Sequence, residues 1–242
     1  MDQVPCAFVL GRNNTLNHVG HEAWVASIGG DGLRKRQCTL MPTVRAYGKQ
    51  IVPLVIIFRG KGIGLKQEEW DFYESLEGVR VVFQPKAWCD TQIMLWYVLN
   101  VLKPALLEHG ICTKEQLLFL DNLGAHRVRE VTQLLSELNI YSFFTAPGCT
   151  DVCAPIDHHV GALLKTYMRK YYHKDCEHGT NYNLWRNATY NKANKSLCAY
   201  NRRKLLATWA TAAWGDLKLN ESMLLKAFLH TGQLSYFGYS VI

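Results

Sequence analysis

Two aspartates stand at positions where a carboxylate can take part in chemistry. Asp121 directly follows the apolar run 116–120, which is typical of a buried strand, and ligands gather at the carboxyl ends of such strands. Asp157 lies in the first turn expected for a helix that begins at Pro155, where the helix dipole favours an acid. Ordinary capping would explain either acid alone. A magnesium or manganese site needs at least one more oxygen ligand, and Asp2 is the candidate.

The elements that must position these acids follow a mixed α/β order. Apolar runs and turn residues predict strands at 36–46, 50–59, 79–83, 116–120 and 140–144, the first two forming an antiparallel hairpin. Helical periodicity predicts helices at 66–76, 90–108, 127–138, from 155 onward, 203–217 and 221–230. We expect Asp90 and Asn220 to cap two of these helices, Pro104 to kink one, and residues 3–34 to be irregular.

The composition is that of a globular protein with an anionic partner. Of 242 residues, 48% are hydrophobic, which excludes disorder as a description of the whole chain. The net charge of +7 makes nucleic acid the first candidate partner. Eight scattered cysteines without a secretion signal before them indicate reduced thiols, and no apolar run is long enough for a membrane span.

Three segments together resemble the catalytic motifs of DDE transposases of the pogo, Tigger, jerky and centromere-protein-B-like branch. Residues 1–5 (MDQVP) are similar to the first motif, 118–126 (LFLDNLGAH) to the second, and 147–157 (PGCTDVCAPID) to the third. Weaker similarity covers the hairpin at 43–61, the helix start at 88–90, and the tail, so that the order of motifs extends over nearly the whole chain.

This resemblance implies an RNase H-like mixed sheet flanked by helices, with a truncated first strand and a helical C-terminal tail. It makes Asp2, Asp121 and Asp157 the catalytic ligands of two Mg²⁺ or Mn²⁺ ions, with Asn122 and His126 as candidates for supporting contacts. It implies cleavage and strand transfer on transposon-end and target DNA, and a nuclear location; a homodimer stays open. The expected division is a catalytic core at 1–174, with a polar loop and helices at 175–242 packed on it.

The chain departs from the family pattern in three respects. Asp2 stands at the second position, so the strand that the family places before its first acid is almost entirely missing. A helix-turn-helix region is missing too, and Ala154 occupies a position that is Gln in many relatives. These departures predict either a fragment or a reduced descendant of a transposon.

A basic stretch follows the third acid. Ten Lys and Arg residues and only two acids lie between Gly161 and Gly215. Lys165, Arg169 and Lys170 avoid the apolar stripe of the predicted helix, and we expect them to contact DNA phosphates beside the reacting bond. The alternative is a merely solvated helix face.

Other interpretations stay open at this stage. A transposon-derived DNA-binding or chromatin protein without activity is the first rival, and another RNase H-like nuclease, such as a resolvase or exonuclease, is the second. A zinc site of Cys149, Cys153, Cys176 and His178 matches no standard spacing, and at most one of His158 and His159 is expected to reach a metal at Asp157. If the nuclease interpretation holds, the three acids should cluster, and at least one pKa should be raised without a cation.

Overall fold

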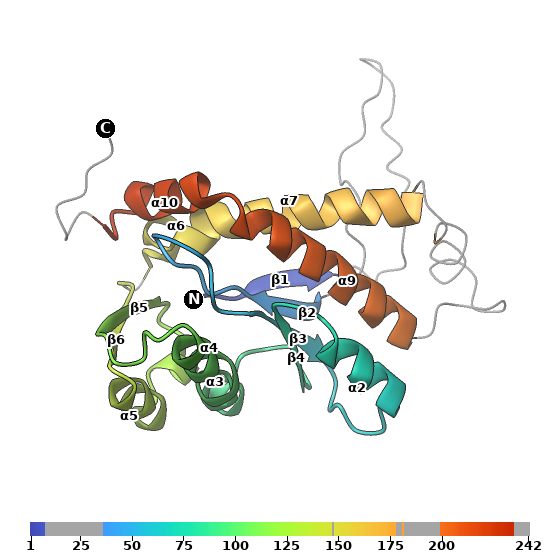
Figure 1. Cartoon of the computed structure of the whole chain (residues 1–242), viewed down its shortest axis with the longest axis horizontal. Helices are drawn as coiled ribbons and strands as arrows, with labels where there is room; N and C mark the ends of the chain where they lie inside the picture. Colours follow the sequence, from blue (N-terminus) through green and yellow to red (C-terminus); the bar gives the residue numbers. More distant parts are fainter. Residues whose placement is uncertain (8–35, 147, 178–180, 182–198, 235–242) are drawn as a thin grey trace, which may run out of the picture.

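The computed structural model describes residues 1–7, 36–146, 148–177, 181 and 199–234 (Figure 1). Within these ranges the chain forms a mixed α/β structure, as the sequence predicts. Among the helices described there, none is both long and apolar enough to cross a bilayer.

Four strands form the larger sheet in the order β1-β2-β3-β4. β1 (Val4–Ala7), β2 (Arg36–Met41) and β3 (Leu54–Arg59) are antiparallel neighbours, and β4 (Val79–Gln84) lies parallel to β3. The predicted hairpin is confirmed, with strands shorter than expected.

The expectation that residues 3–34 are irregular is wrong for Val4–Ala7. This strand is only four residues long and contains Pro5, so no local pattern marks it. It exists because Val4 pairs with Leu40 and Cys6 with Cys38, and all four side chains are buried. The tertiary pairing with β2 therefore decides the structure of this segment.

A second sheet consists of two parallel strands, β5 (Gln116–Leu120) and β6 (Ile140–Phe144), at the predicted positions. They are connected by η2 (Gly124–His126) and the helix α5 (Arg129–Glu137). Among the described strands, β5 pairs with β6 alone, so the two sheets are separate.

The strand β3 divides the interior into two hydrophobic cores. Its residues alternate between the faces of the sheet: Leu54, Ile56 and Phe58 belong to one core, whereas Val55 and Ile57 belong to the other. Burial on both faces explains why this strand is an uninterrupted apolar run.

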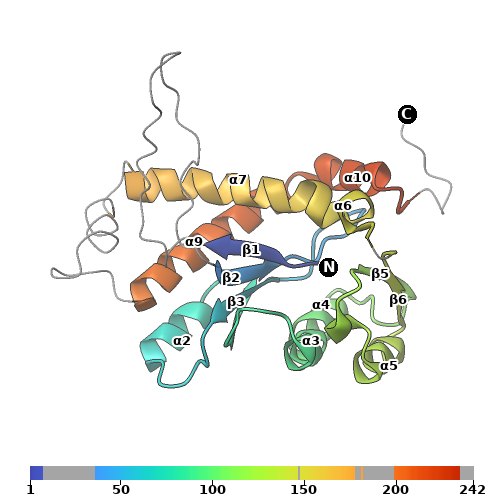
Figure 2. The ribbon, with the colours of Figure 1, turned by 180° about the vertical axis from the view of Figure 1, so that it is seen from behind.

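The first core lies under the long helices (Figures 1 and 2). It is covered by α2 (Gln67–Glu74), α7 (Gly161–Tyr172), α9 (Ala199–Lys218) and α10 (Glu221–His230). Trp209 and Trp214 of α9 and Tyr172 of α7 are among its largest fully buried side chains. α7 continues from the π-helical turn η3 (Ile156–Val160), follows α6 (Thr150–Cys153), and leads into η4 (His173–Glu177).

The second core joins the opposite face of the larger sheet to β5 and β6. It is built from α3 (Thr91–Tyr97), the π-helical segment η1 (Val98–Leu102), α4 (Lys103–Glu108) and α5. Asp90 caps α3 as predicted, since its side chain accepts a hydrogen bond from the amide of Ile93. The expected irregularity at Pro104 takes the form of the π-helical segment immediately before it.

Candidate active site

Asp2 is buried immediately before β1. The residue is 6% exposed, and its backbone amide donates to the carbonyl of Pro42 at 3.4 Å. Oδ1 accepts from the amide of Gln3 at 2.6 Å, but the buried Oδ2 has no hydrogen-bond partner among the described residues. A buried carboxylate oxygen without a partner is costly, so a bound cation or a proton would stabilise it.

Asp121 follows the last residue of β5 and is held by its own turn. Oδ1 accepts from the amide of Leu123 at 3.3 Å and lies 2.6 Å from Nδ1 of His126. The His126 ring is fully buried. Its Nδ1 makes a close polar contact with Asp121 that is not a well-aligned hydrogen bond, and its Nε2 has no hydrogen-bond partner in the described part of the chain.

Asp157 lies in η3, is exposed, and is brought to β1 by close packing of the helix. A Cβ added to Gly161 would lie 3.0 Å from the backbone oxygen of Ile156 and 3.2 Å from a methyl group of Val4. A side chain at this position would force the helix or Val4 to shift. Because Val4 is two residues from Asp2, the same contact fixes the helix of Asp157 beside Asp2.

The charges of Asp157 and Asp121 both reach Asp2. The pKa of Asp2 is raised to about 6, first by burial and then by the charge of Asp157, with a smaller effect from Asp121. Burial also raises the pKa of Asp121, but the contact with His126, the amide of Leu123 and the Met1 ammonium group lower it below its usual value. The expected rise in a pKa is thus found at Asp2, although burial is its largest cause.

The donor atoms of the three acids suit a divalent cation, but their arrangement does not form a group of metal ligands. The three side chains offer only carboxylate oxygens, which Mg²⁺ and Mn²⁺ prefer, and one of these oxygens is buried without a partner. However, within the described ranges no three His, Cys, Asp or Glu side chains are grouped so that they could hold an ion. The predicted clustering therefore stays a prediction.

Residues 35–223 match the family model described as DDE superfamily endonuclease. The chain belongs to this family. Comparisons with curated proteins and with solved structures give no match. The mixed sheet flanked by helices is the RNase H-like fold of a DDE endonuclease, in agreement with the fold predicted from the sequence.

The neighbours of Asp121 in this DDE endonuclease have different structural roles. His126 contacts Asp121 directly, whereas the side-chain amide of Asn122 donates to the carbonyl of Thr145. The bond from Asn122 ties the end of β5 to the end of β6. The role of Asn122 that the structure describes is therefore structural, and His126 is the better candidate for orienting an acid.

The basic residues predicted to bind DNA lie along α7. Lys165 is half-buried, while Arg169 and Lys170 are exposed. Nζ of Lys170 lies 3.2 Å from a carboxylate oxygen of Asp216 on α9, so its charge is partly matched within the protein.

Two basic residues further along the stretch, both on α9, make contacts with other side chains of the protein. Arg203 is 2.6 Å from the carboxylate of Glu69, which also accepts a hydrogen bond from Tyr73. Nζ of Lys204 lies 4.6 Å from the ring centre of Phe72. Two of the ten cations in the basic stretch thus serve the packing of α9 on α2. Arg186, Lys192 and Lys195 lie outside the described residues.

The alternative zinc site does not assemble from the described residues. Cys153 and Cys176 lie at opposite ends of the helical segment formed by η3, α7 and η4, and a helix of that length spans roughly 30 Å. His178 lies outside the described residues. His158 and His159 instead contact each other, with Nδ1 and Nε2 3.0 Å apart.

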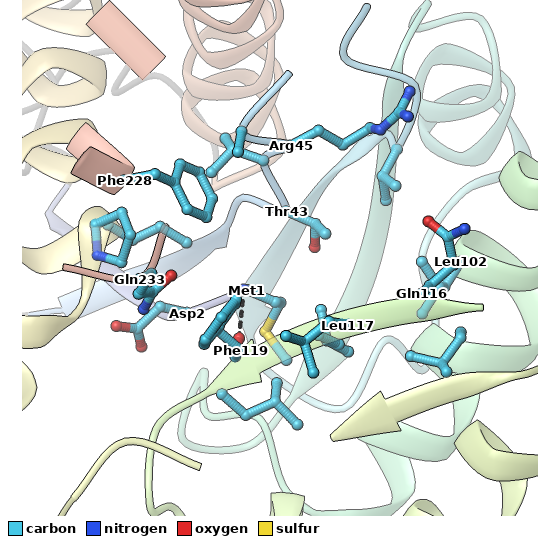
Figure 3. Close-up of a pocket in the computed structure, with 18 of the residues that line it drawn as sticks. Met1, Asp2, Thr43, Arg45, Leu102, Gln116, Leu117, Phe119, Phe228 and Gln233 are labelled. Carbon is cyan, nitrogen blue, oxygen red and sulfur yellow. Dashed lines mark hydrogen bonds between the residues drawn. The ribbon is translucent and has the colours of Figure 1, made fainter. Parts of the chain in front are cut away.

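Sequence reasoning missed two residues beside the acids. The Met1 nitrogen donates to the carbonyl of Phe119 at 3.0 Å and links the start of β1 to β5 (Figure 3). Gln233 lies beside Asp2, donates to the carbonyl of Cys153 at 2.8 Å, and has a buried Oε1 without a described partner. It supplies an amide near Ala154, where the family pattern suggested that one was missing. Gln233 follows α10, and no local sequence pattern predicts that a residue there lies beside Asp2.

Proposed function

We propose that the chain is the metal-dependent DNA cleavage and strand-transfer core of a transposase of the pogo, Tigger, jerky and centromere-protein-B-like branch. One observation carries the proposal. The buried carboxylate of Asp2, whose Oδ2 has no hydrogen-bond partner among the described residues, lies in the electrostatic field of both Asp157 and Asp121, in a member of the DDE endonuclease family. Mutual repulsion of this kind disfavours the ionised protein alone and favours a bound cation.

In this proposal Asp2, Asp121 and Asp157 hold two Mg²⁺ or Mn²⁺ ions. When bound, such ions stabilise the charge that develops on a phosphodiester during attack by water or by a 3′-hydroxyl. The contact of His126 with Asp121 fixes one carboxylate and holds its pKa low, so that this acid stays ionised and available. A bound cation would compete with a proton for the carboxylate of Asp2, whose pKa is raised to about 6.

A second candidate function is that of a transposon-derived DNA-binding protein without cleavage activity. It is favoured by the absence of a group of three metal ligands among the described residues. The two candidates differ in one respect: only the first requires the carboxylates to close around an ion.

The test is incubation of purified protein with supercoiled plasmid and labelled transposon-end duplexes, with Mg²⁺, Mn²⁺ or chelator. We expect metal-dependent nicking that Asp121→Asn reduces at least about a hundredfold, since a lost charge-stabilising group costs 10²–10³ in rate. Asp71→Asn is the matched control, because Asp71 is an exposed acid of α2. DNA binding without nicking in any metal would favour the second candidate.

A further inference from the structure

The connection between β4 and α3, residues 85–90, is held in one conformation by the side chain of Gln84 (Figures 1 and 2). Oε1 of Gln84 accepts from the amide of Lys86 at 2.6 Å and from that of Trp88 at 3.2 Å. Its Nε2 donates to the carboxylate of Asp90 at 3.1 Å. One side chain thus bonds to three positions of the connection and fixes its shape in the protein alone.

The backbone of this connection is strained at Ala87. The φ of Ala87 is 52°, in the left-handed region that residues with a Cβ rarely adopt. Its carbonyl accepts from the buried hydroxyl of Thr39 on β2 at 2.6 Å. Ala87 and Cys89 are fully buried, whereas Trp88 between them is 40% exposed. The strain therefore accompanies an arrangement that leaves a large aromatic side chain at the surface, and strained backbone of this kind is concentrated at functional sites.

The exposed tryptophan follows the chain past the candidate active site. The amide of the next residue, Cys89, donates to Oε1 of Gln3 at 3.0 Å, and Gln3 is adjacent to Asp2 in sequence. Burial, and then the charges of Asp90 and Asp121, raise the pKa of the Cys89 thiol to about 12. The backbone beside the tryptophan is therefore bonded to the segment that carries one candidate metal ligand and lies in the field of another.

The surface at the carboxyl ends of β3 and β4, where this connection begins, carries positive charge. The two strands run parallel and end together, with Arg59 opposite Gln84. The side chains of Arg59, Lys61 and Lys86 are exposed. The eight residues that start at Arg59 and the six that start at Gln84 contain no acid. A surface of this kind attracts phosphate groups, but it does not distinguish paired from unpaired bases.

We propose that Trp88 stacks on one unpaired nucleobase of the DNA beside the candidate site, while Lys86 contacts a neighbouring phosphate. This inference rests on the proposed function, because it requires DNA at the site. An indole ring offers a flat face to any base, and a base reaches such a ring only after it has left the duplex stack. Because the connection is already ordered, little conformational freedom is lost when the base binds.

The experiment measures DNA binding by the full chain in chelator, where no cleavage occurs. Two labelled duplexes are compared by fluorescence anisotropy: one is fully paired, and the other is identical except for a single unpaired thymidine. Trp88→Phe keeps an aromatic face and Trp88→Leu removes it, with Trp88→Met as the substitute if the Leu variant does not fold. Tyr141→Leu is the matched control, because Tyr141 is an aromatic residue of β6 that is 56% exposed. Thermal midpoints establish that each variant is folded.

We expect the wild type to bind the duplex with the unpaired base at least about fivefold more tightly than the paired duplex, the lower end for one stacked base. Trp88→Phe and Tyr141→Leu should keep this preference, and Trp88→Leu should lose it. Lys86→Ala should weaken binding to both duplexes by the same factor, because a phosphate contact is independent of pairing.

The outcome is separable from that of the cleavage assay. Asp121→Asn should keep the preference for the unpaired base, since the measurement needs no metal and no cleavage. Absence of cleavage together with this preference would count against the proposed function and leave the role of Trp88 intact. The role of Trp88 is overturned if the wild type shows no preference, if folded Trp88→Leu retains it, or if Trp88→Leu weakens binding to both duplexes equally.

Discussion

The candidate site has two parts, Asp2 with Asp157 and Asp121 by itself, and these parts are packed on different cores. Asp2 and Asp157 belong to elements that share the first core, where Val4 and Val160 are buried together and Gly161 fits against Val4. Asp121 follows a strand of the two-stranded sheet, which is packed on the second core. In the structure described, the Met1–Phe119 hydrogen bond links the start of β1 directly to β5.

The two parts also differ in their electrostatic effect on Asp2. The charge of Asp157 affects the pKa of Asp2 more strongly than the charge of Asp121 does. We infer that packing sets the distance between Asp2 and Asp157 more directly than the distance from Asp2 to Asp121. The following predictions test the elements around Asp2 and Asp157, in decreasing order of expected effect, and the last measurement includes Asp121.

The largest effect is expected from breaking the ion pair that seats α9 on α2. Arg203→Met should lower the free energy of unfolding by roughly 3–5 kcal/mol, because it leaves the buried carboxylate of Glu69 without its cation. Urea unfolding measures this loss. Lys204→Met, next in sequence and placed over an aromatic ring, is the control and should cost under about 1 kcal/mol. Equal losses in the two variants would contradict a structural role for Arg203.

The pH dependence of stability should reveal the buried acid. The pKa of Asp2 is about 6 in the folded protein against 3.8 as the reference, so the folded state binds this proton more tightly. The stability that results is present below pH 4 and lost as the pH rises to 6, by roughly 3 kcal/mol at most. Comparing metal-free wild type with Asp2→Asn isolates this change. Parallel stability curves for the two proteins between pH 4 and 7 would refute it.

The close contact at Gly161 should be sensitive to a single methyl group. Gly161→Ala should cost about 1–3 kcal/mol, because the added carbon meets backbone and a buried valine, and should reduce cleavage by moving Asp157 from Asp2. Gly215→Ala in α9 is the matched control, since a Cβ there meets nothing within 4 Å. Its expected effect is neutral to stabilising. The packing argument fails if the two variants are equally stable.

The smallest effect concerns the cations of α7. Lys165, Arg169 and Lys170 replaced together by Ala should weaken binding to unrelated DNA sequences alike and flatten the salt dependence. Among the single variants, Arg169→Ala should lose more affinity than Lys170→Ala, because Lys170 is already paired with Asp216. Fluorescence anisotropy at several salt concentrations measures both. An unchanged salt slope in the triple variant would place the DNA elsewhere.

Local patterns in the sequence were sufficient for much of the fold. The apolar run before Asp121, the cap at Asp90 and the cap at Asn220 each depend on neighbouring residues, and all three are found where predicted. The resemblance added the family and the order of the acids. The domain division at 174/175 and the roles of the site residues stay predictions.

What could not be predicted depends on contacts between distant segments. The strand β1 forms because it pairs with β2. The two sheets are separate because, among the described strands, β5 pairs only with β6. The number of basic residues in the sequence does not predict which of them form ion pairs. Arg203 forms an ion pair with Glu69, whereas Arg169 is exposed. Nor could Gly161 be singled out, since its importance comes from Val4, far away in sequence.

The central claim is that Asp2, Asp121 and Asp157 together bind divalent cations, and titration calorimetry with Mn²⁺ above pH 7 tests it most directly. We predict that wild type and Asp71→Asn bind alike, and that each of Asp2→Asn, Asp121→Asn and Asp157→Asn loses at least tenfold in affinity. Below pH 6 the wild-type affinity should also fall, because protons compete for Asp2. Wild-type affinity in any folded Asn variant of the three acids would contradict the claim.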